Sequence, residues 1–164
     1  MLRCAASFVI AAYPQKYASF LRICAPCLRT FYEAVRNSTF YEGIKYLLDT
    51  NFILGILKSN PVVLADIAAR QIRTAECGYS TITRMELLGF PGITREEEVL
   101  IRQKLALLVH VPLTENIEDV VINLRQTRRI KLPDAIISAT ALCNGAELLT
   151  LDTRLLSIVK ADSK

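Results

Sequence analysis

The stretch Lys45-Tyr46-Leu47-Leu48-Asp49-Thr50-Asn51 decides the fold of this chain. Three apolar residues lead into a carboxylate, and a helical-looking run, residues 52–57, follows directly. A short apolar run bounded by polar residues predicts a buried strand, especially where helical patterns adjoin it. Asp49 then stands where a strand ends and a helix begins. In open α/β sheets this is the edge at which ligands bind.

The sequence after this stretch alternates between helix and strand patterns. Further strands are predicted at residues 79–82, 109–111 and 147–150, and helices at residues 61–74, 84–88, 94–108, 114–129 and 134–143. Thr94 and Glu97 have the spacing of a capping box at a helix start, and so do Thr83 and Glu86. Pro61 suits the first turn of a helix. Strands that alternate with helices predict an α/β fold with a parallel sheet.

Composition narrows the class of protein. The chain has 164 residues, of which 52% are apolar and 22% charged, and this suits one globular domain. Its apolar runs are shorter than the ~18 residues of a membrane span, so we expect no membrane partner. Five scattered cysteines argue against a disulfide framework and favour a cytoplasmic location. A single histidine and one isolated Cys-x-x-Cys pair, Cys24 and Cys27, offer too few ligands for zinc.

Residues 1–44 differ in character from the main domain, which we place at residues 45–160. Residues 1–45 carry six Lys and Arg against two acids, whereas residues 46–164 carry 14 of each. The net charge of +4 therefore does not predict a polyanionic partner for the main domain. Two interpretations of residues 1–44 stand: an amphipathic helical extension, or upstream sequence read from a misplaced start codon.

Three further acids stand at junctions of the same kind as that of Asp49. Asp49, Glu86 and Asp152 lie within four residues of a predicted strand end, and Asp134 opens a helix. Each has a purely structural interpretation as a helix cap or a first-turn acid. Together, however, they would meet at one rim of a parallel sheet. Two like charges ~4 Å apart cost about 4 kcal/mol at an effective dielectric near 20, and a divalent cation such as Mg²⁺ or Mn²⁺ would offset this repulsion.

The segments around these acids resemble the PIN-domain ribonucleases, above all the VapC-type toxins of toxin–antitoxin pairs. The resemblance spans about residues 45–158 and rests on residues 47–51, 83–89, 131–141 and 149–152. It implies a three-layer α/β/α fold with a central parallel sheet of four to five strands. It also implies cleavage of RNA that depends on Mg²⁺ or Mn²⁺. Asp49, Glu86 and Asp134 match the metal-holding acids, and Asp152 matches a fourth, more variable one.

The resemblance extends to supporting residues and partners. Thr50, Asn51 and Thr150 match positions that support the acids, a bound water or a phosphate. An inhibitory antitoxin and a homodimer are expected partners beside the RNA substrate. Four basic residues are candidate phosphate contacts, although a solvated helix face explains them equally well: Arg84, Arg128, Arg129 and Lys131.

Two other functions fit parts of the pattern. A PIN module that has lost catalysis would only bind RNA or a protein partner, but it would not need all four acids. A phosphatase of the haloacid-dehalogenase kind also begins with an aspartate after a strand. That family needs a second aspartate two residues later, where this chain has Asn51.

Overall fold

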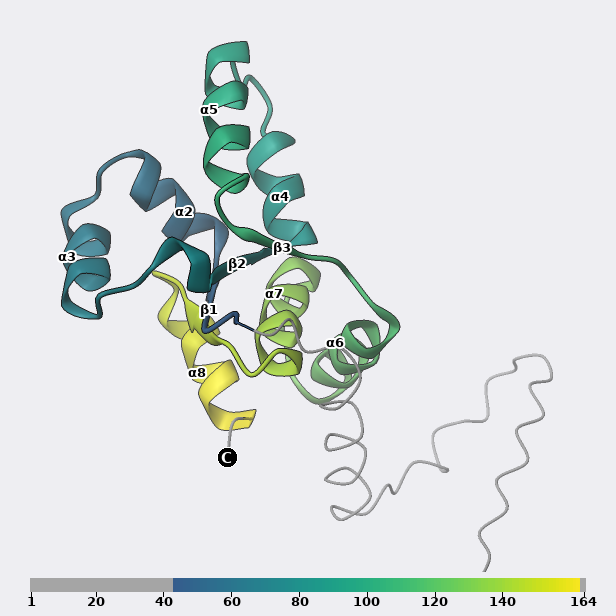
Figure 1. Cartoon of the computed structure of the whole chain (residues 1–164). Helices are drawn as coiled ribbons and strands as arrows, with labels where there is room; N and C mark the ends of the chain where they lie inside the picture. Colours follow the sequence, from purple (N-terminus) through teal and green to yellow (C-terminus); the bar gives the residue numbers. More distant parts are fainter. Residues whose placement is uncertain (1–42, 163–164) are drawn as a thin grey trace, which may run out of the picture. The chain divides into compact units, whose positions relative to one another are not determined.

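Four short parallel strands form the central sheet of the described residues, in the order β3-β2-β1-β4 (Figure 1). The structure is a computed structural model that describes residues 43–162. The strands are β1 (Tyr46–Leu48), β2 (Cys77–Ser80), β3 (Val109–Val111) and β4 (Glu147–Leu149). Leu47 of β1 lies beside Gly78 of β2 on one side and Leu148 of β4 on the other. The parallel α/β fold predicted from the sequence is thus confirmed, with β1 in the interior of the sheet.

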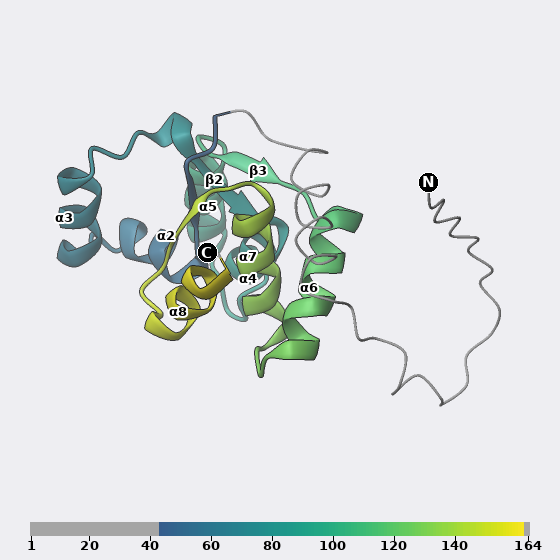
Figure 2. The same ribbon diagram turned by 90° about the horizontal axis from the view of Figure 1, so that it is seen from below.

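Helices connect the strands and cover both faces of the sheet. They are α2 (Thr50–Leu57), α3 (Pro61–Ala69), α4 (Thr81–Leu88), α5 (Arg95–Leu105), α6 (Glu115–Thr127), α7 (Leu132–Cys143) and α8 (Thr153–Asp162), with a 3-10 turn, η2 (Thr74–Glu76). On one face α7 packs against β1, β2 and β4, and α6 and α8 flank α7 (Figure 2). Helices α2 to α5 cover the other face, which gives the three-layer arrangement.

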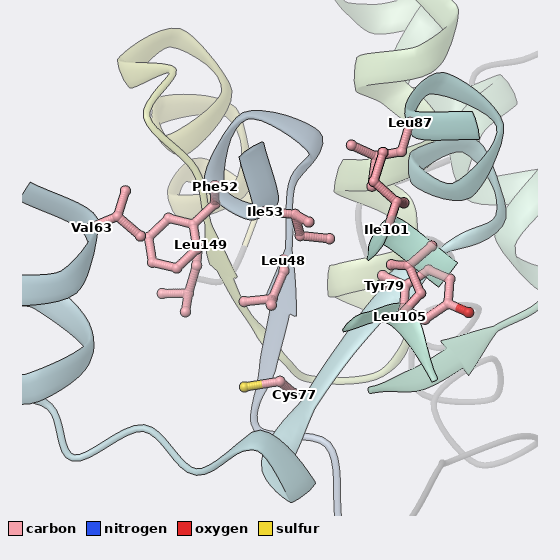
Figure 3. Packing of buried hydrophobic residues seen from close by; sticks show 10 residues of the cluster. All are labelled: Leu48, Phe52, Ile53, Val63, Cys77, Tyr79, Leu87, Ile101, Leu105 and Leu149. Atoms are coloured by element: carbon pink, nitrogen blue, oxygen red, sulfur yellow. The ribbon is translucent and has the colours of Figure 1, made fainter. Parts of the chain in front are cut away.

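The core between the sheet and helices α2 to α5 consists of apolar side chains that alternate along the strands. Leu48, Tyr79 and Leu149 point into it from β1, β2 and β4, and helical side chains close over them (Figure 3). Helices α2 and α3 approach closely because Gly55 has no side chain: a Cβ atom there would lie 2.6 Å from Cγ2 of Val63. This packing fixes the direction in which α2 leaves the end of β1.

Side-chain caps confirm several of the predicted helix starts. Thr94 and Glu97 form the predicted capping box at the start of α5. Asn60 caps α3 through a 2.9 Å bond from the Val62 N–H to its Oδ1, and Pro61 occupies the first helical position. Such caps satisfy N–H groups that have no partner inside the helix.

Two predicted boundaries were wrong. Helix α3 ends at Ala69 and not near residue 74. Gln71 adopts a left-handed conformation (φ 52°), and the Ile72 N–H donates to the Ile67 carbonyl at 3.1 Å. This is the bonding of a Schellman motif, which usually has glycine at the left-handed position. With glutamine there, the sequence did not show the helix end.

The second wrong boundary concerns β2 and α4. The strand ends at Ser80 and the helix starts at Thr81, so the predicted strand 79–82 and helix 84–88 were both misplaced. Ser80 is the N-cap and accepts from the Thr83 N–H at 3.2 Å, so the predicted capping box of Thr83 and Glu86 does not form. The strand propensity of residues 80–82 was overridden by the cap, and Glu86 therefore lies well inside the helix.

The predicted extension, residues 1–44, lies almost wholly outside the described residues. Within residues 43–162, no single helix has the length and apolar character needed to cross a membrane. Helices α2 and α3 meet the length and composition criteria for a membrane span only when they are taken together as a pair. The two helices are bent by 102° relative to each other.

Candidate active site

Asp49 stands at the end of the interior strand β1 and at the start of α2. Its Oδ1 accepts a 2.7 Å hydrogen bond from the Thr50 N–H, which makes Asp49 the N-cap of α2. Its own N–H donates to the carbonyl of Leu149 on β4 at 3.0 Å. The residue is only 5% exposed. The structural interpretation of Asp49 as a helix cap is therefore correct, but it accounts for only one of the two carboxylate oxygens.

Thr150 connects Asp49 to Asp152. The Thr150 hydroxyl donates to Oδ2 of Asp49 at 2.6 Å and accepts from the Asp152 N–H at 3.0 Å. Oδ1 of Asp152 accepts from the N–H of Arg154 at 2.8 Å at the start of α8, so Asp152 is a helix cap as well. One hydroxyl thus holds together two acids that are far apart in the sequence.

Glu86 reaches the same place from α4. The Thr50 hydroxyl donates a hydrogen bond to Oε2 of Glu86, while the Thr50 N–H is bonded to Asp49. Glu86 is exposed, unlike Asp49. Thr50 therefore joins Asp49 and Glu86 as Thr150 joins Asp49 and Asp152.

Asp134 completes the group through its charge. It lies half-buried in the first turn of α7. Burial raises the pKa of Asp49, and the negative charges of Asp134 and Asp152 raise it further, while hydrogen bonds from Thr150 and Thr50 lower it. None of the four acids forms an ion pair with another described residue. The charges of Asp134 and Asp152 thus act on a buried Asp49 that has no cationic partner among the described residues.

The side chains are not arranged as a finished set of metal ligands. Within residues 43–162, no three Asp, Glu, His or Cys side chains lie close enough together to hold one metal ion. The acids are linked through the hydroxyls of Thr50 and Thr150 and through electrostatics. The chemistry of the donors still suits a hard divalent cation, because such ions prefer carboxylate oxygens.

The basic residues singled out in the sequence lie in different settings. Arg84 is exposed on α4, two residues before Glu86. Arg128 donates from Nη1 to the Ile158 carbonyl at 3.0 Å and so ties the end of α6 to α8. Arg129 and Lys131 are exposed just before the first turn of α7. Arg128 thus has a structural bond, whereas the other three present their charge to solvent.

A cavity of about 360 Å³ borders the acids on the side of α2. Its lining residues are Asn51, Leu54, Gly55, Lys58, Asn60, Leu151 and Asp152. Sequence analysis had considered Asn51 and Asp152 but gave no role to Lys58 or Asn60. The spacing of the sequence could have identified Lys58, because it follows Asn51 by seven residues and therefore lies on the same face of a helix.

Comparisons with known proteins agree with the observed fold. The family model described as "PIN domain" matches residues 46–161. A toxin–antitoxin complex from Klebsiella pneumoniae is 28% identical, with a TM-score of 0.59 over 67% of this chain and 88% of that one. FitAcB from Neisseria gonorrhoeae is 24% identical, with a TM-score of 0.59 over 70% of this chain and 93% of that one.

More distant similarity extends to VapBC2 from Rickettsia felis, solved with a DNA fragment from its promoter. It is 18% identical, with a TM-score of 0.54 over 70% of this chain and 93% of that one. At this identity the likeness shows the fold alone. A search of curated proteins found no match.

Proposed function

Because the chain belongs to the PIN-domain family, we propose that it is a metal-dependent endoribonuclease, the toxin of a toxin–antitoxin pair. One observation carries the proposal: the buried carboxylate of Asp49 feels the negative charges of Asp134 and Asp152 and lacks a cationic partner among the described residues. Such a group is costly in a folded protein unless it binds something positive. The similarity to the Klebsiella pneumoniae complex supports the toxin role.

Mg²⁺ or Mn²⁺ is the proposed cofactor; Asp49, Glu86, Asp134 and Asp152 are the acids that would hold it, and their side chains would have to move closer together to do so. When bound, such an ion lowers the pKa of a water and stabilises charge on the phosphate oxygens. Thr150 and Thr50 hold carboxylate oxygens of Asp49 and Glu86 in place through their hydroxyls. A carboxylate of this group accepts the proton of the attacking water. No side chain is needed as a nucleophile.

RNA is the proposed substrate, and an antitoxin protein the proposed partner. The similarity to the toxin–antitoxin complex from Klebsiella pneumoniae supports a partner of this kind. Assembly as a homodimer and location in the cytoplasm belong to the same proposal. Arg84, Arg129 and Lys131 are exposed and near Glu86 or Asp134 in sequence, so they are the candidates for contacts with the RNA backbone.

The direct test is cleavage of a labelled structured RNA by the purified full chain. We expect cleavage with Mg²⁺ or Mn²⁺, none with EDTA, and a loss of about hundredfold or more in Asp49→Asn, because proton transfer and ion binding both need the carboxylate. Asp119→Asn, an exposed acid on α6, is the matched control and should cleave like the wild type.

Circular dichroism shows whether each variant folds. Undiminished cleavage by Asp49→Asn would refute the assignment of the acids. A folded wild type that cleaves no RNA with either ion would favour the other function of this fold, a PIN module that only binds RNA or a protein partner.

A further inference from the structure

The cavity adjoins the proposed active site at one of the four acids. It includes Asp152 itself, and Asn51 follows Thr50 directly in α2. A ligand in the cavity would therefore lie next to anything bound at the acids. Its volume of about 360 Å³ is within the usual range for pockets that hold small organic groups.

One face of α2 forms the wall of the cavity. Asn51, Leu54 and Lys58 are spaced by three and four residues, so they share one side of the helix. With a rise of 1.5 Å per residue, the wall runs roughly 10 Å from Asn51 to Lys58. The wall starts next to the acids, at Asn51, and ends at a cation, Lys58.

The far end of this wall is held rigidly by the backbone. Ser59 adopts a left-handed conformation (φ 53°), and the Asn60 N–H donates to the Gly55 carbonyl at 2.8 Å. The Asn60 side chain in turn accepts from the Val62 N–H. These hydrogen bonds end α2 and begin α3, so Lys58 and Asn60 lie in a hydrogen-bonded turn between the two helices.

The lining combines the groups that recognise a nucleotide. Lys58 is exposed and is the single cation among the lining residues, and it forms no ion pair with a described residue. Asn51 and Asn60 carry amides that can donate to a base edge or a sugar hydroxyl. Leu54 and Leu151 supply the apolar surface that a base or ribose covers. The acids themselves repel RNA, so a cation just beyond them helps to hold the strand.

We propose that this cavity binds the nucleotide next to the scissile phosphate, with Lys58 contacting its backbone phosphate. The inference rests on the proposed ribonuclease function and adds the direction in which the RNA strand leaves the acids, along α2 toward α3. Lys58 acts in substrate binding and not in catalysis.

The test measures binding of a fluorescein-labelled single-stranded RNA by fluorescence anisotropy at several salt concentrations. The full chain carries Asp49→Asn, so the RNA stays intact in Mg²⁺. Adding Lys58→Glu should weaken binding about tenfold and lower the slope of log affinity against log salt by about 0.7, the value for one lost phosphate contact on a single strand. Lys104→Glu is the matched control, because Lys104 is an exposed lysine at the C-terminal end of a helix, α5, as Lys58 is at the end of α2.

The results separate this proposal from the nuclease itself. If Lys58→Glu binds RNA with the affinity and salt slope of Lys104→Glu, while the wild type still cleaves RNA, the cavity is not a nucleotide site and is left for a peptide of a partner protein. If the wild type neither binds nor cleaves RNA, the cavity and the nuclease proposals fall together. A selective loss in Lys58→Glu supports both.

Discussion

At the scale of single residues, opposing interactions act on the pKa of Asp49. Burial raises its pKa, and the neighbouring charges of Asp134 and Asp152 act in the same direction. Hydrogen bonds from Thr150 and Thr50 favour the charged form and offset part of this effect. The burial of Asp49 and the charges near it therefore make its negative charge unfavourable for the fold when nothing positive neutralises it.

We expect Asp49→Asn to be more thermally stable than the wild type at pH 7 in EDTA. Because the pKa of Asp49 is raised in the folded state, folding takes up a proton between the ordinary and the raised pKa, and the free energy of unfolding falls as the pH rises through that range. Asparagine removes this penalty and can still cap α2. The gain should shrink as the pH is lowered toward the ordinary aspartate value, about 3.9.

Thermal unfolding followed by circular dichroism at several pH values measures this difference, with Asp119→Asn as the reference at an exposed acid. A lower Tm for Asp49→Asn at pH 7 would mean that the carboxylate stabilises the fold, and the account of its environment would be wrong.

The sequence placed each acid at a strand end or a helix start, and the structure has Asp49, Asp134 and Asp152 at such positions. The cap at Asp152 was among the interpretations that the sequence allowed, and one of its oxygens does cap α8. The sequence could not reveal the hydrogen bonds that connect these acids, because the Thr150 hydroxyl that donates to Asp49 lies 101 residues away in the chain. Contacts of this kind depend on the packing of whole elements and leave no periodic pattern in the sequence.

At the scale of elements, the start of α4 positions Glu86. Ser80 and Thr83 are both fully buried, and their hydroxyls lie 2.9 Å apart in addition to the capping bond. Sequence reasoning favoured strand for this segment because β-branched residues follow Ser80. Sequence patterns are local, so they could not show that the buried Ser80 would cap the helix and that the helix would begin three residues earlier than expected.

Ser80→Ala should lower the free energy of unfolding by about 2 kcal/mol, because it removes a cap and leaves the buried hydroxyl of Thr83 without its partner. The exposed cap of α5 offers a control: Thr94→Ala should cost only about 1 kcal/mol. Urea denaturation measures both. Equal losses in the two variants would contradict a special role for the buried pair.

At the scale of the whole molecule, the strand order decides where the acids meet. Strand β1 lies between β2 and β4, so Asp49 emerges between the strands that lead to α4 and Asp152. Alternating helices and strands were enough to predict a parallel α/β sheet, and the family resemblance implied its three layers. The order of the strands was not derivable in the same way, because several orders satisfy the same alternation.

We expect Mg²⁺ or Mn²⁺ to raise the Tm of the wild type. A ligand that binds only the folded state at a hundredfold excess over its Kd adds about 2.7 kcal/mol, which corresponds to a shift of roughly 10 °C for a domain of this size. Asp49→Asn should lose most of the shift, and NaCl at equal ionic strength should not reproduce it. An identical rise in the variant would point to cation binding elsewhere.

The position of β4 has a consequence for synthesis. It is the last strand of the sheet, yet it pairs with β1, and both Thr150 and Asp152 follow it. A growing chain on the ribosome therefore leaves one side of β1 open, and Asp49 without its hydroxyl partner, until nearly the whole domain has emerged. Chains whose translation has not yet passed β4 therefore lack Asp152 and the hydroxyl that holds Asp49.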